Sequence, residues 1–283
     1  MVRFSWKIKS HLKYIINRFL SYYFVDVTFK DRMCLFINYI NHEIFRVRKN
    51  VNVEMKDFAG NIFVNVINLP FRKDRRERIN AIMNLNETEF EFFEGTYGNT
   101  LSDRDLNYVT NRSRYNLSKG SIGCSISHIK LWEYIAQQSS NDIFIILEDD
   151  VILYPGFKNT IYKLTKNLPV DYDIIFLGSN STRGRDVSYY VNANLFKSFN
   201  PRRGLYAYLV NPRSSKKLVK LIKPFDLLYG GIDTKIGKLV RNAVIIAYHF
   251  SPSIVGVDTL NTSNIYNFSL RNKKRLMFEF EKE

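Results

Sequence analysis

The sequence predicts an α/β fold in which helices flank a mostly parallel sheet. Two observations predict it. Short apolar runs rich in β-branched residues alternate along the chain with segments whose apolar residues recur every three or four positions. The length of 283 residues is enough for one large α/β domain or two small ones. Strands and helices in alternation favour parallel strands with helical crossovers.

The first expected unit runs from residue 61 to residue 85. Residues 61–69 form an apolar run that Pro70 ends, which predicts a buried strand followed by a loop. Apolar residues at helical spacing from Ile79 to Leu85 then predict a helix. The other expected elements follow in chain order: strand 90–93, helix 120–138, strand 142–147, strand 173–177, strand 207–210, helix 214–222, helix 234–240 and strand 244–248.

The chain is strongly basic. Its 42 Lys and Arg residues against 27 Asp and Glu give a formal charge of +15, which attracts phosphate, nucleic acid or an anionic membrane. The first 58 residues carry eleven basic and five acidic side chains. Apolar residues three or four apart predict an amphipathic helix there: Phe4, Ile8, Leu12, Ile15, Phe19 and Tyr23. We expect this basic arm, residues 1–58, either to pack on its own domain or to bind an anionic membrane surface through residues 1–24.

Several protein classes are excluded by the pattern. Charges interrupt every apolar run before the roughly 18–20 residues that a membrane-spanning helix needs, and no small-residue cleavage site follows such a run. Cys34 and Cys124 make no disulfide framework, so two reduced thiols are favoured over one disulfide. We therefore expect a cytoplasmic protein, with peripheral membrane attachment as an alternative. Its main domain is placed at residues 59–270, followed by a charged tail at 271–283.

Three adjacent carboxylates, Glu148, Asp149 and Asp150, follow the apolar run 142–147. Ligands in open α/β sheets bind beyond the carboxyl ends of the strands. Adjacent carboxylates repel one another unless a cation or hydrogen-bond donors offset their charge. Oxygen-only ligands suit Mg²⁺ or Mn²⁺. A divalent cation bound to a diphosphate is one interpretation, and a solvated acidic turn is the other.

Two further segments carry groups that could bind a ligand. Residues 68–76 place four basic side chains near a helix start, where arginines and backbone amides bind phosphate. Residues 120–128 contain two glycines followed by Ser127 and His128, so this segment could approach a ligand closely or pack a helix tightly. The arginine-containing segment 179–203 is expected to be a long loop, either a lid over substrate or solvated charge.

Taken in order, these segments resemble glycosyltransferase family 25, which includes bacterial lipooligosaccharide sugar transferases, collagen galactosyltransferases and relatives in large viruses. The resemblance spans roughly residues 61–268. It rests on Val-Ile-Asn-Leu-Pro-Phe-Arg-Lys-Asp-Arg-Arg (66–76), Gly-Ser-Ile-Gly-Cys-Ser-Ile-Ser-His-Ile-Lys-Leu-Trp-Glu (120–133) and Ile-Leu-Glu-Asp-Asp-Val (146–151). The middle block is the most specific of the three.

The resemblance implies a GT-A-like fold, lipopolysaccharide-type biosynthesis, and inverting transfer of a hexose, galactose being favoured, from a UDP-sugar to a glycan, glycolipid or glycoprotein acceptor. A Mn²⁺ or Mg²⁺ ion would assist. The implied catalytic residues are Asp150 and Asp233, the latter as the base or else as a helix cap. The implied metal ligands are Asp150, Asp149, Glu148 and His249, of which His249 could equally be a core histidine. The implied nucleotide-sugar-binding residues are Asn68, Arg72, Arg75, Gly123, His128 and Asp149.

Two alternative functions belong to other classes. A basic nucleic-acid-binding protein would use the +15 charge and the aromatic side chains, but we disfavour nucleic acid as a partner because no such motif occurs and the acidic triplet repels a phosphate backbone. An inactive transferase-like membrane scaffold would bind a nucleotide without turnover.

Overall fold

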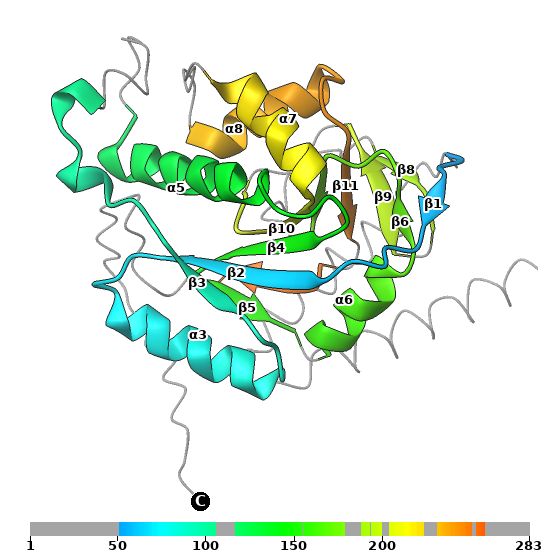
Figure 1. The fold of residues 1–283 in the computed structure, drawn as a ribbon, viewed down its shortest axis with the longest axis horizontal. Helices are drawn as coiled ribbons and strands as arrows, with labels where there is room; N and C mark the ends of the chain where they lie inside the picture. Colours follow the sequence, from blue (N-terminus) through cyan, green and yellow to red (C-terminus); the bar gives the residue numbers. More distant parts are fainter. Residues whose placement is uncertain are drawn as a thin grey trace, which may run out of the picture.

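The computed structural model describes residues 51–105, 117–154, 156–178, 188–192, 194–199, 204–223, 231–250 and 253–257 (Figure 1). The predicted amphipathic helix in residues 1–24, the arginines of the segment 179–203 and the tail at 271–283 lie outside these ranges. Among the described helices, none is both long and apolar enough to cross a membrane.

The elements agree with most of those expected. The strands are β1 (Met55–Lys56), β2 (Ile62–Asn68), β3 (Glu91–Glu94), β4 (Ile143–Glu148), β5 (Val151–Leu153), β6 (Leu168–Pro169), β7 (Ile174–Phe176), β8 (Ser188–Tyr190), β9 (Leu195–Ser198), β10 (Ala207–Val210), β11 (Ala247–Phe250) and β12 (Val255–Val257). The helices are α3 (Lys73–Leu85), η1 (Gly98–Thr100), α5 (Lys119–Ile135), α6 (Phe157–Thr165), α7 (Pro212–Ile222) and α8 (Gly231–Arg241).

A central sheet carries the fold. Within the described part of the chain it has eight strands in the order β3-β2-β4-β10-β7-β11-β9-β8. The pairs β3–β2, β2–β4 and β7–β11 are parallel, whereas β10 and β9 run antiparallel to their neighbours. The predicted α/β class with a mostly parallel sheet is confirmed, because six of these strands share one direction. The two reversed strands were not expected, since antiparallel neighbours need no helical crossover that sequence alternation would reveal.

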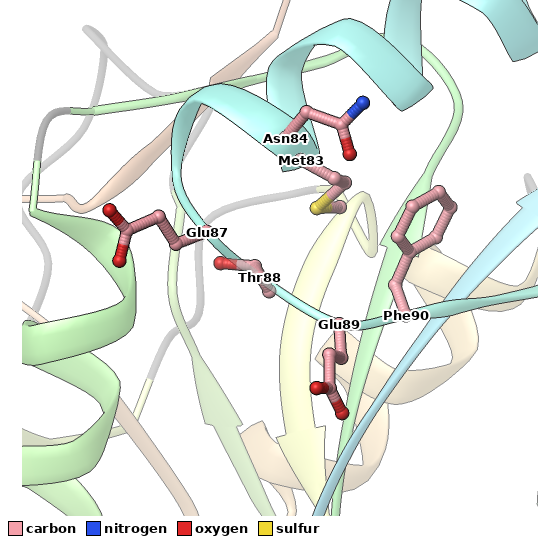
Figure 2. Close-up of a pocket in the computed structure, with 6 residues that line it drawn as sticks. All are labelled: Met83, Asn84, Glu87, Thr88, Glu89 and Phe90. Atoms are coloured by element: carbon pink, nitrogen blue, oxygen red, sulfur yellow. The ribbon is translucent and has the colours of Figure 1, made fainter.

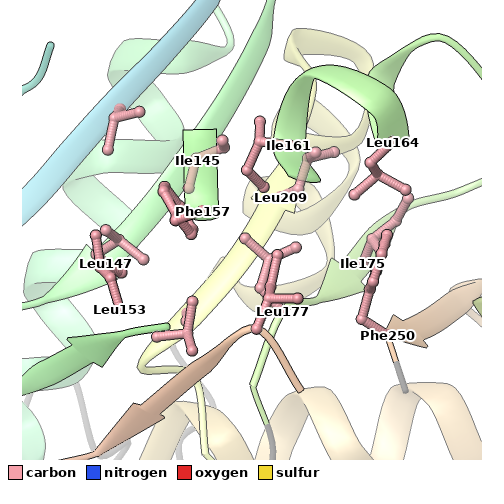
Figure 3. Packing of buried hydrophobic residues seen from close by; sticks show 14 of the residues in the cluster. Ile145, Leu147, Leu153, Phe157, Ile161, Leu164, Ile175, Leu177, Leu209 and Phe250 are labelled. Carbon is pink, nitrogen blue, oxygen red and sulfur yellow. The ribbon is translucent and has the colours of Figure 1, made fainter. Parts of the chain in front are cut away.

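Helices cover both faces of this sheet (Figure 1). One face packs against α5, α7 and α8 through a core that includes Trp132, Ile146 and Tyr208. The other face packs against α3 and α6, and Figure 3 shows Phe157, Ile161 and Leu164 of α6 among side chains of β4 and β7. Two buried cores therefore hold the sheet rigidly, and its strand ends are positioned by both.

Two segments contain strands that the sequence did not predict. Residues 51–58, which the sequence assigned to the arm, pack on the domain: β1 pairs with β6, and the rings of Phe58 and Tyr172 meet edge to face at 5.9 Å. The segment 179–203 was expected to be one loop, but it contributes β8 and β9 to the sheet. Both differences arise from tertiary pairing of two to four residues, which leaves little local pattern.

Gly123 on α5 is one place where the helix and the loop before it approach closely. A methyl group at this position would lie 2.5 Å from the Thr96 carbonyl oxygen and 2.6 Å from the Gly98 nitrogen. The Ser127 hydroxyl stabilises the same contact, because it accepts a hydrogen bond from the Thr96 N–H at 2.7 Å. Of the two interpretations of the 120–128 segment, tight helix packing therefore fits the contacts of Gly123.

Gly123→Ala is therefore expected to lower the free energy of unfolding by about 1–3 kcal/mol, because backbone on both sides must shift. Gly237→Ala on α8 is the matched control. Its added methyl group would meet only the tip of the flexible Arg241 side chain, at 3.4 Å, so we expect a gain of about 0.5–1 kcal/mol from the better helix former. Urea unfolding of the two variants checks this, and equal effects would contradict it.

Candidate active site

The carboxyl ends of β2 and β4 lie side by side because the two strands pair in parallel. Asn68, the last residue of β2, donates through Nδ2 to Asp149 Oδ2 at 2.8 Å. Arg75, in the first turn of α3, pairs with Asp149 Oδ1. Asp149 is 6% exposed and both of its oxygens are engaged by the protein. It anchors the turn after β4 to β2 and α3.

Asp150, the next residue, has a different environment. Its Oδ2 lies 3.7 Å from Arg75 Nη1, but its buried Oδ1 has no hydrogen-bond partner among the residues that the structure describes. Burial and the negative charge of Glu148 raise the pKa of Asp150 from 3.8 to about 7, against the opposing charges of Arg75 and Arg78. A buried carboxylate oxygen without a hydrogen-bond partner is unfavourable when other negative charges lie nearby, and a bound cation would offset that charge.

Glu148, at the end of β4, is held from beneath by α5. His128 is fully buried, and its Nε2 lies 3.3 Å from Glu148 Oε1. The other ring nitrogen, Nδ1, lies 2.9 Å from the Tyr208 hydroxyl, which also accepts from Trp132 Nε1 at 2.9 Å. Both nitrogens of His128 are therefore engaged inside the protein, so we place it behind Glu148 instead of in direct contact with a nucleotide.

Asp233 joins the acidic edge from α8. The helix begins at Gly231, so Asp233 lies in its first turn and the predicted start at residue 234 is corrected by the structure. The Ser125 hydroxyl on α5 accepts from the Ile232 N–H at 3.1 Å and fixes this end of α8. Burial raises the pKa of the Cys124 thiol well above its usual range.

Nearby acidic groups also raise the pKa of the Cys124 thiol. After burial, the charges that raise the Cys124 pKa are, in order, those of Glu148, Asp233, Asp150 and Asp149. The negative charges of four carboxylates from two regions far apart in sequence therefore act on one buried thiol. The sequence predicted all four as site residues, and the fold brings them together.

Three other predicted site residues have different surroundings. Arg72 donates from Nε and Nη2 to the two oxygens of Asp74, at 2.9 and 2.7 Å, and so lies at the start of α3 in an ion pair. His249 lies on β11 and stacks on Phe196, with ring centroids 5.6 Å apart. Since β11 is three strands from β4 in the sheet, the structure does not group His249 with the acidic triplet. Gly123 contacts the backbone of residues 96–98.

A hollow of about 400 Å³ lies at the C-terminal end of α3, whereas Arg72 and Arg75 lie at its N-terminal end (Figure 2). Its lining comes from the end of that helix and the approach to β3: Met83, Asn84, Glu87, Thr88, Glu89 and Phe90. None of the predicted site residues is among them, and we assign it no role in the acidic edge.

The carboxylates of this edge differ in how well they fit a divalent cation. Asp150 fits, because its buried Oδ1 has no hydrogen-bond partner among the described residues, and because burial and the neighbouring negative charges outweigh the positive charges of Arg75 and Arg78. Glu148 fits as a second oxygen ligand beside it, whereas Asp149 already has two partners on its two oxygens. In the described part of the chain, the metal-ligand types that gather in a group of three within 4.8 Å are Cys124, His128 and Glu148. The acidic edge therefore favours Asp150 over Asp149 and His249 as the metal ligand.

Sequence reasoning missed three contributors to this edge. Tyr208 and Trp132 support His128, and Arg78 donates to the Val151 carbonyl oxygen at 2.9 Å and holds the turn that carries Asp150. In the Ser-His-x-x-x-Trp segment that starts at Ser127, the histidine and the tryptophan are four residues apart, so they face the same side of α5 and can contact one partner. That partner, Tyr208 on β10, is 80 residues away from His128.

The comparisons with known proteins give the class. The chain is 32% identical over 172 residues to a protein of Acanthamoeba polyphaga mimivirus named as a glycosyltransferase, covering 56% of this chain and 52% of that protein. It is 30% identical over 125 residues to human procollagen galactosyltransferase 2, covering 40% of this chain and 20% of the relative. A Haemophilus influenzae protein named as a glycosyltransferase is 28% identical over 174 residues, covering 57% and 59%. The class is that of the glycosyltransferases.

The chain belongs to glycosyltransferase family 25. The family model described as "Glycosyltransferase family 25 (LPS biosynthesis protein)" matches residues 61–233, from the start of β2 to Asp233. The chain spans less than two thirds of the length of each relative named above. A glycosyltransferase involved in the glycosylation of the major capsid of PBCV-1 matches with a TM-score of 0.31 and 11% identity, over 66% of this chain and 92% of the other. That similarity is too low to support an inference.

Proposed function

We propose that this chain transfers a hexose, with galactose favoured, from a UDP-sugar to a glycan, glycolipid or glycoprotein acceptor, with inversion and with the help of Mn²⁺ or Mg²⁺. The observation that carries the proposal is the buried Oδ1 of Asp150, which has no hydrogen-bond partner in the described part of the chain and is subject to the negative charge of neighbouring carboxylates. Membership of family 25 supports glycosyl transfer in general.

Asp150 and Glu148 would hold the cation. When bound, it would offset the negative charge that develops on the departing diphosphate, which is electrostatic stabilisation and needs no covalent step from the protein. Asp149 has another task in this proposal. It keeps Asn68 and Arg75 in place at the ends of β2 and α3, and Arg75 also lies 3.7 Å from Asp150. The nucleotide would thus meet a rigid edge.

The start of α3 is proposed for the diphosphate side of the donor. Arg72 precedes the first turn of this helix, where backbone N–H groups and the helix dipole favour anions. Its ion pair with Asp74 is formed by a carboxylate that is 64% exposed, so exchanging that partner for phosphate costs little. The buried Oδ1 of Asn68, which no described residue contacts through a hydrogen bond, can accept a hydrogen bond from the sugar donor.

Asp233 is proposed as the base. It would take the proton from the acceptor hydroxyl as that oxygen bonds to the anomeric carbon, while the bond from this carbon to the phosphate oxygen breaks and its electron pair leaves with the diphosphate. Ser125 fixes the first turn of α8, and the charge of Asp233 in this turn acts on the same Cys124 thiol as the charges of the acidic triplet.

Incubation of the purified chain with UDP-sugars and Mn²⁺, with and without an acceptor glycan, tests the proposal directly. We expect donor consumption that depends on the cation, together with a donor-dependent rise in melting temperature, because ligands bind the native state. A chain that neither binds any UDP-sugar nor responds to the cation would overturn it. Binding without turnover would favour the inactive-scaffold alternative.

Asp233→Asn is expected to lower kcat by about 10²–10⁴-fold, the usual contribution of a positioned base, while the Mn²⁺ affinity stays within about twofold. The control is Asp142→Asn, which alters a buried acid at the other end of β4 and keeps the oxygen that accepts from the Asn61 N–H. Steady-state kinetics and Mn²⁺ titration separate the two. An unchanged kcat for Asp233→Asn would remove this residue from the mechanism.

A further inference from the structure

A chain of buried polar groups runs from the core to the acidic edge. Trp132 Nε1 donates to the Tyr208 hydroxyl oxygen at 2.9 Å, this hydroxyl lies 2.9 Å from His128 Nδ1, and His128 Nε2 lies 3.3 Å from Glu148 Oε1. Trp132, Tyr208 and His128 are fully buried, whereas the Glu148 side chain is 24% exposed. The chain therefore begins in the core and ends at the surface where ligands bind.

The donor and acceptor roles along this chain follow from its first member. An indole N–H can only donate, so the Tyr208 oxygen accepts from Trp132. Burial raises the pKa of Tyr208 well above its usual range, so the phenol keeps its proton and can donate it to His128 Nδ1. A neutral imidazole that accepts at Nδ1 carries its proton on Nε2, facing the Glu148 carboxylate. In this tautomer, each group donates to the next.

The N–H that His128 directs at Glu148 restricts the glutamate side chain. A glutamate side chain has several rotatable bonds and is not held in place by its backbone alone. Here one oxygen is fixed by His128, with the Cys124 sulfur 4.0 Å from the same atom. His128 itself cannot turn without losing the Tyr208 hydroxyl. The carboxylate is therefore held in one orientation at the end of β4.

The position of Glu148 also affects Asp150. Among the neighbouring charges that act on Asp150, that of Glu148 has the largest effect. A Glu148 carboxylate that moved into solvent would weaken this interaction. Glu148 and Asp150 are two residues apart in the chain, and Asp150 Oδ1 is buried with no hydrogen-bond partner among the described residues, so the two carboxylates offer oxygen ligands of the kind that a divalent cation prefers.

We propose that His128, backed by Tyr208 and Trp132, is a positioning residue that fixes the Glu148 carboxylate beside Asp150 and so sets the affinity of the acidic edge for a divalent cation. This inference rests on the proposed function. It assigns the Ser-His-x-x-x-Trp spacing of α5 a supporting role behind the ligands, in which His128 touches neither cation nor nucleotide. Groups in this position typically change metal affinity by about 10–100-fold when they are removed.

A matched pair of substitutions tests the proposal. Glutamine carries an acceptor and a donor on one group, as the imidazole does, whereas methionine has the same length and no donor. The full chain is titrated with Mn²⁺ alone, and free Mn²⁺ is followed by its paramagnetic resonance signal. We expect His128→Gln to bind Mn²⁺ within about threefold of the wild type and His128→Met to bind it about tenfold more weakly. Equal affinity of His128→Met and wild type would overturn the proposal.

A second measurement separates positioning from packing and needs no cation. Urea unfolding is measured for His128→Met, Glu148→Gln, the double variant and the wild type. If His128 acts through Glu148, His128→Met shifts the midpoint less in the Glu148→Gln background than in the wild-type background. Additive shifts would mean that His128 only fills space, and the proposal would fail.

Failure of the proposed function has a different signature. A wild type that consumes no UDP-sugar but shows the non-additive unfolding shifts would retain the positioning role and lose the transferase proposal. A wild type that consumes a UDP-sugar, with additive shifts and an unchanged Mn²⁺ affinity for His128→Met, would retain the transferase proposal and lose the positioning role.

Discussion

Asp150→Asn is expected to lower cation-dependent sugar transfer by about 10³-fold or more and to leave the native fold at least as stable. The amide has the same shape but cannot supply a charged ligand, and metal assistance to a leaving diphosphate is worth several kcal/mol. The fold gains because the native carboxylate is buried beside Glu148 with one oxygen lacking a partner. Transfer kinetics and urea unfolding check both halves, and a variant with full activity would remove Asp150 from the site.

The pH dependence of stability gives a second, metal-free readout of the same residue. The native pKa of Asp150, about 7, lies above the ordinary 3.8, so the native state binds this proton more tightly than the unfolded state does. The stabilisation from Asp150 is fully present below about pH 4 and is lost as the pH rises through about 7. Each pKa unit corresponds to about 1.4 kcal/mol, so a loss on the order of a few kcal/mol is expected.

Urea unfolding in the presence of a chelator, at several pH values between 5 and 8, measures this slope. Asp150→Asn is expected to flatten it, because the titrating group is gone. Glu91→Gln, on the exposed face of β3, controls for the loss of one negative charge. Parallel slopes for wild type and Asp150→Asn would show that Asp150 titrates normally in the folded protein.

The strands that form the sheet were predictable because their signal is local. All five residues from Ile143 to Leu147 are buried, and a strand buried on both faces must be apolar throughout. The same reasoning located β2, β7 and β10. The direction of β10 was not predictable, because Tyr208 pairs with Ile146 on one side and Phe176 on the other through contacts that no local pattern records.

The candidate site was predictable as a set of residues and not as a set of roles. Asp149 and Asp150 are identical neighbours in sequence, and the motif contains both. What distinguishes them is that Asn68 and Arg75, 81 and 74 residues away, both bind Asp149. Likewise His128 was expected to face a ligand, and the hydroxyl that turns it toward Glu148 comes from β10. Roles depend on which long-range partner occupies each polar atom.

Arg75→Met is expected to have the largest effect on stability, a loss of about 3–5 kcal/mol or failure to fold. The side chains of Arg75 and Asp149 are 7% and 9% exposed, and truncating one partner of a buried ion pair leaves the other charge unpaired. The loss is compounded because Arg75 also lies 3.7 Å from Asp150. Chemical denaturation of the purified protein, or its soluble yield, measures the effect.

The neighbouring Arg72→Met is the matched control, because its ion pair with Asp74 involves a carboxylate that is 64% exposed and contributes about 0–1 kcal/mol. A second comparison uses Asp149→Asn, which removes the buried charge and keeps an oxygen for Asn68. If Arg75 acts by neutralising Asp149, then Arg75→Met costs much less in that background than in the wild type. Equal costs for the two arginine variants would mean that the acidic edge does not depend on this pair for its assembly, and Asp149 would then become available as a metal ligand after all.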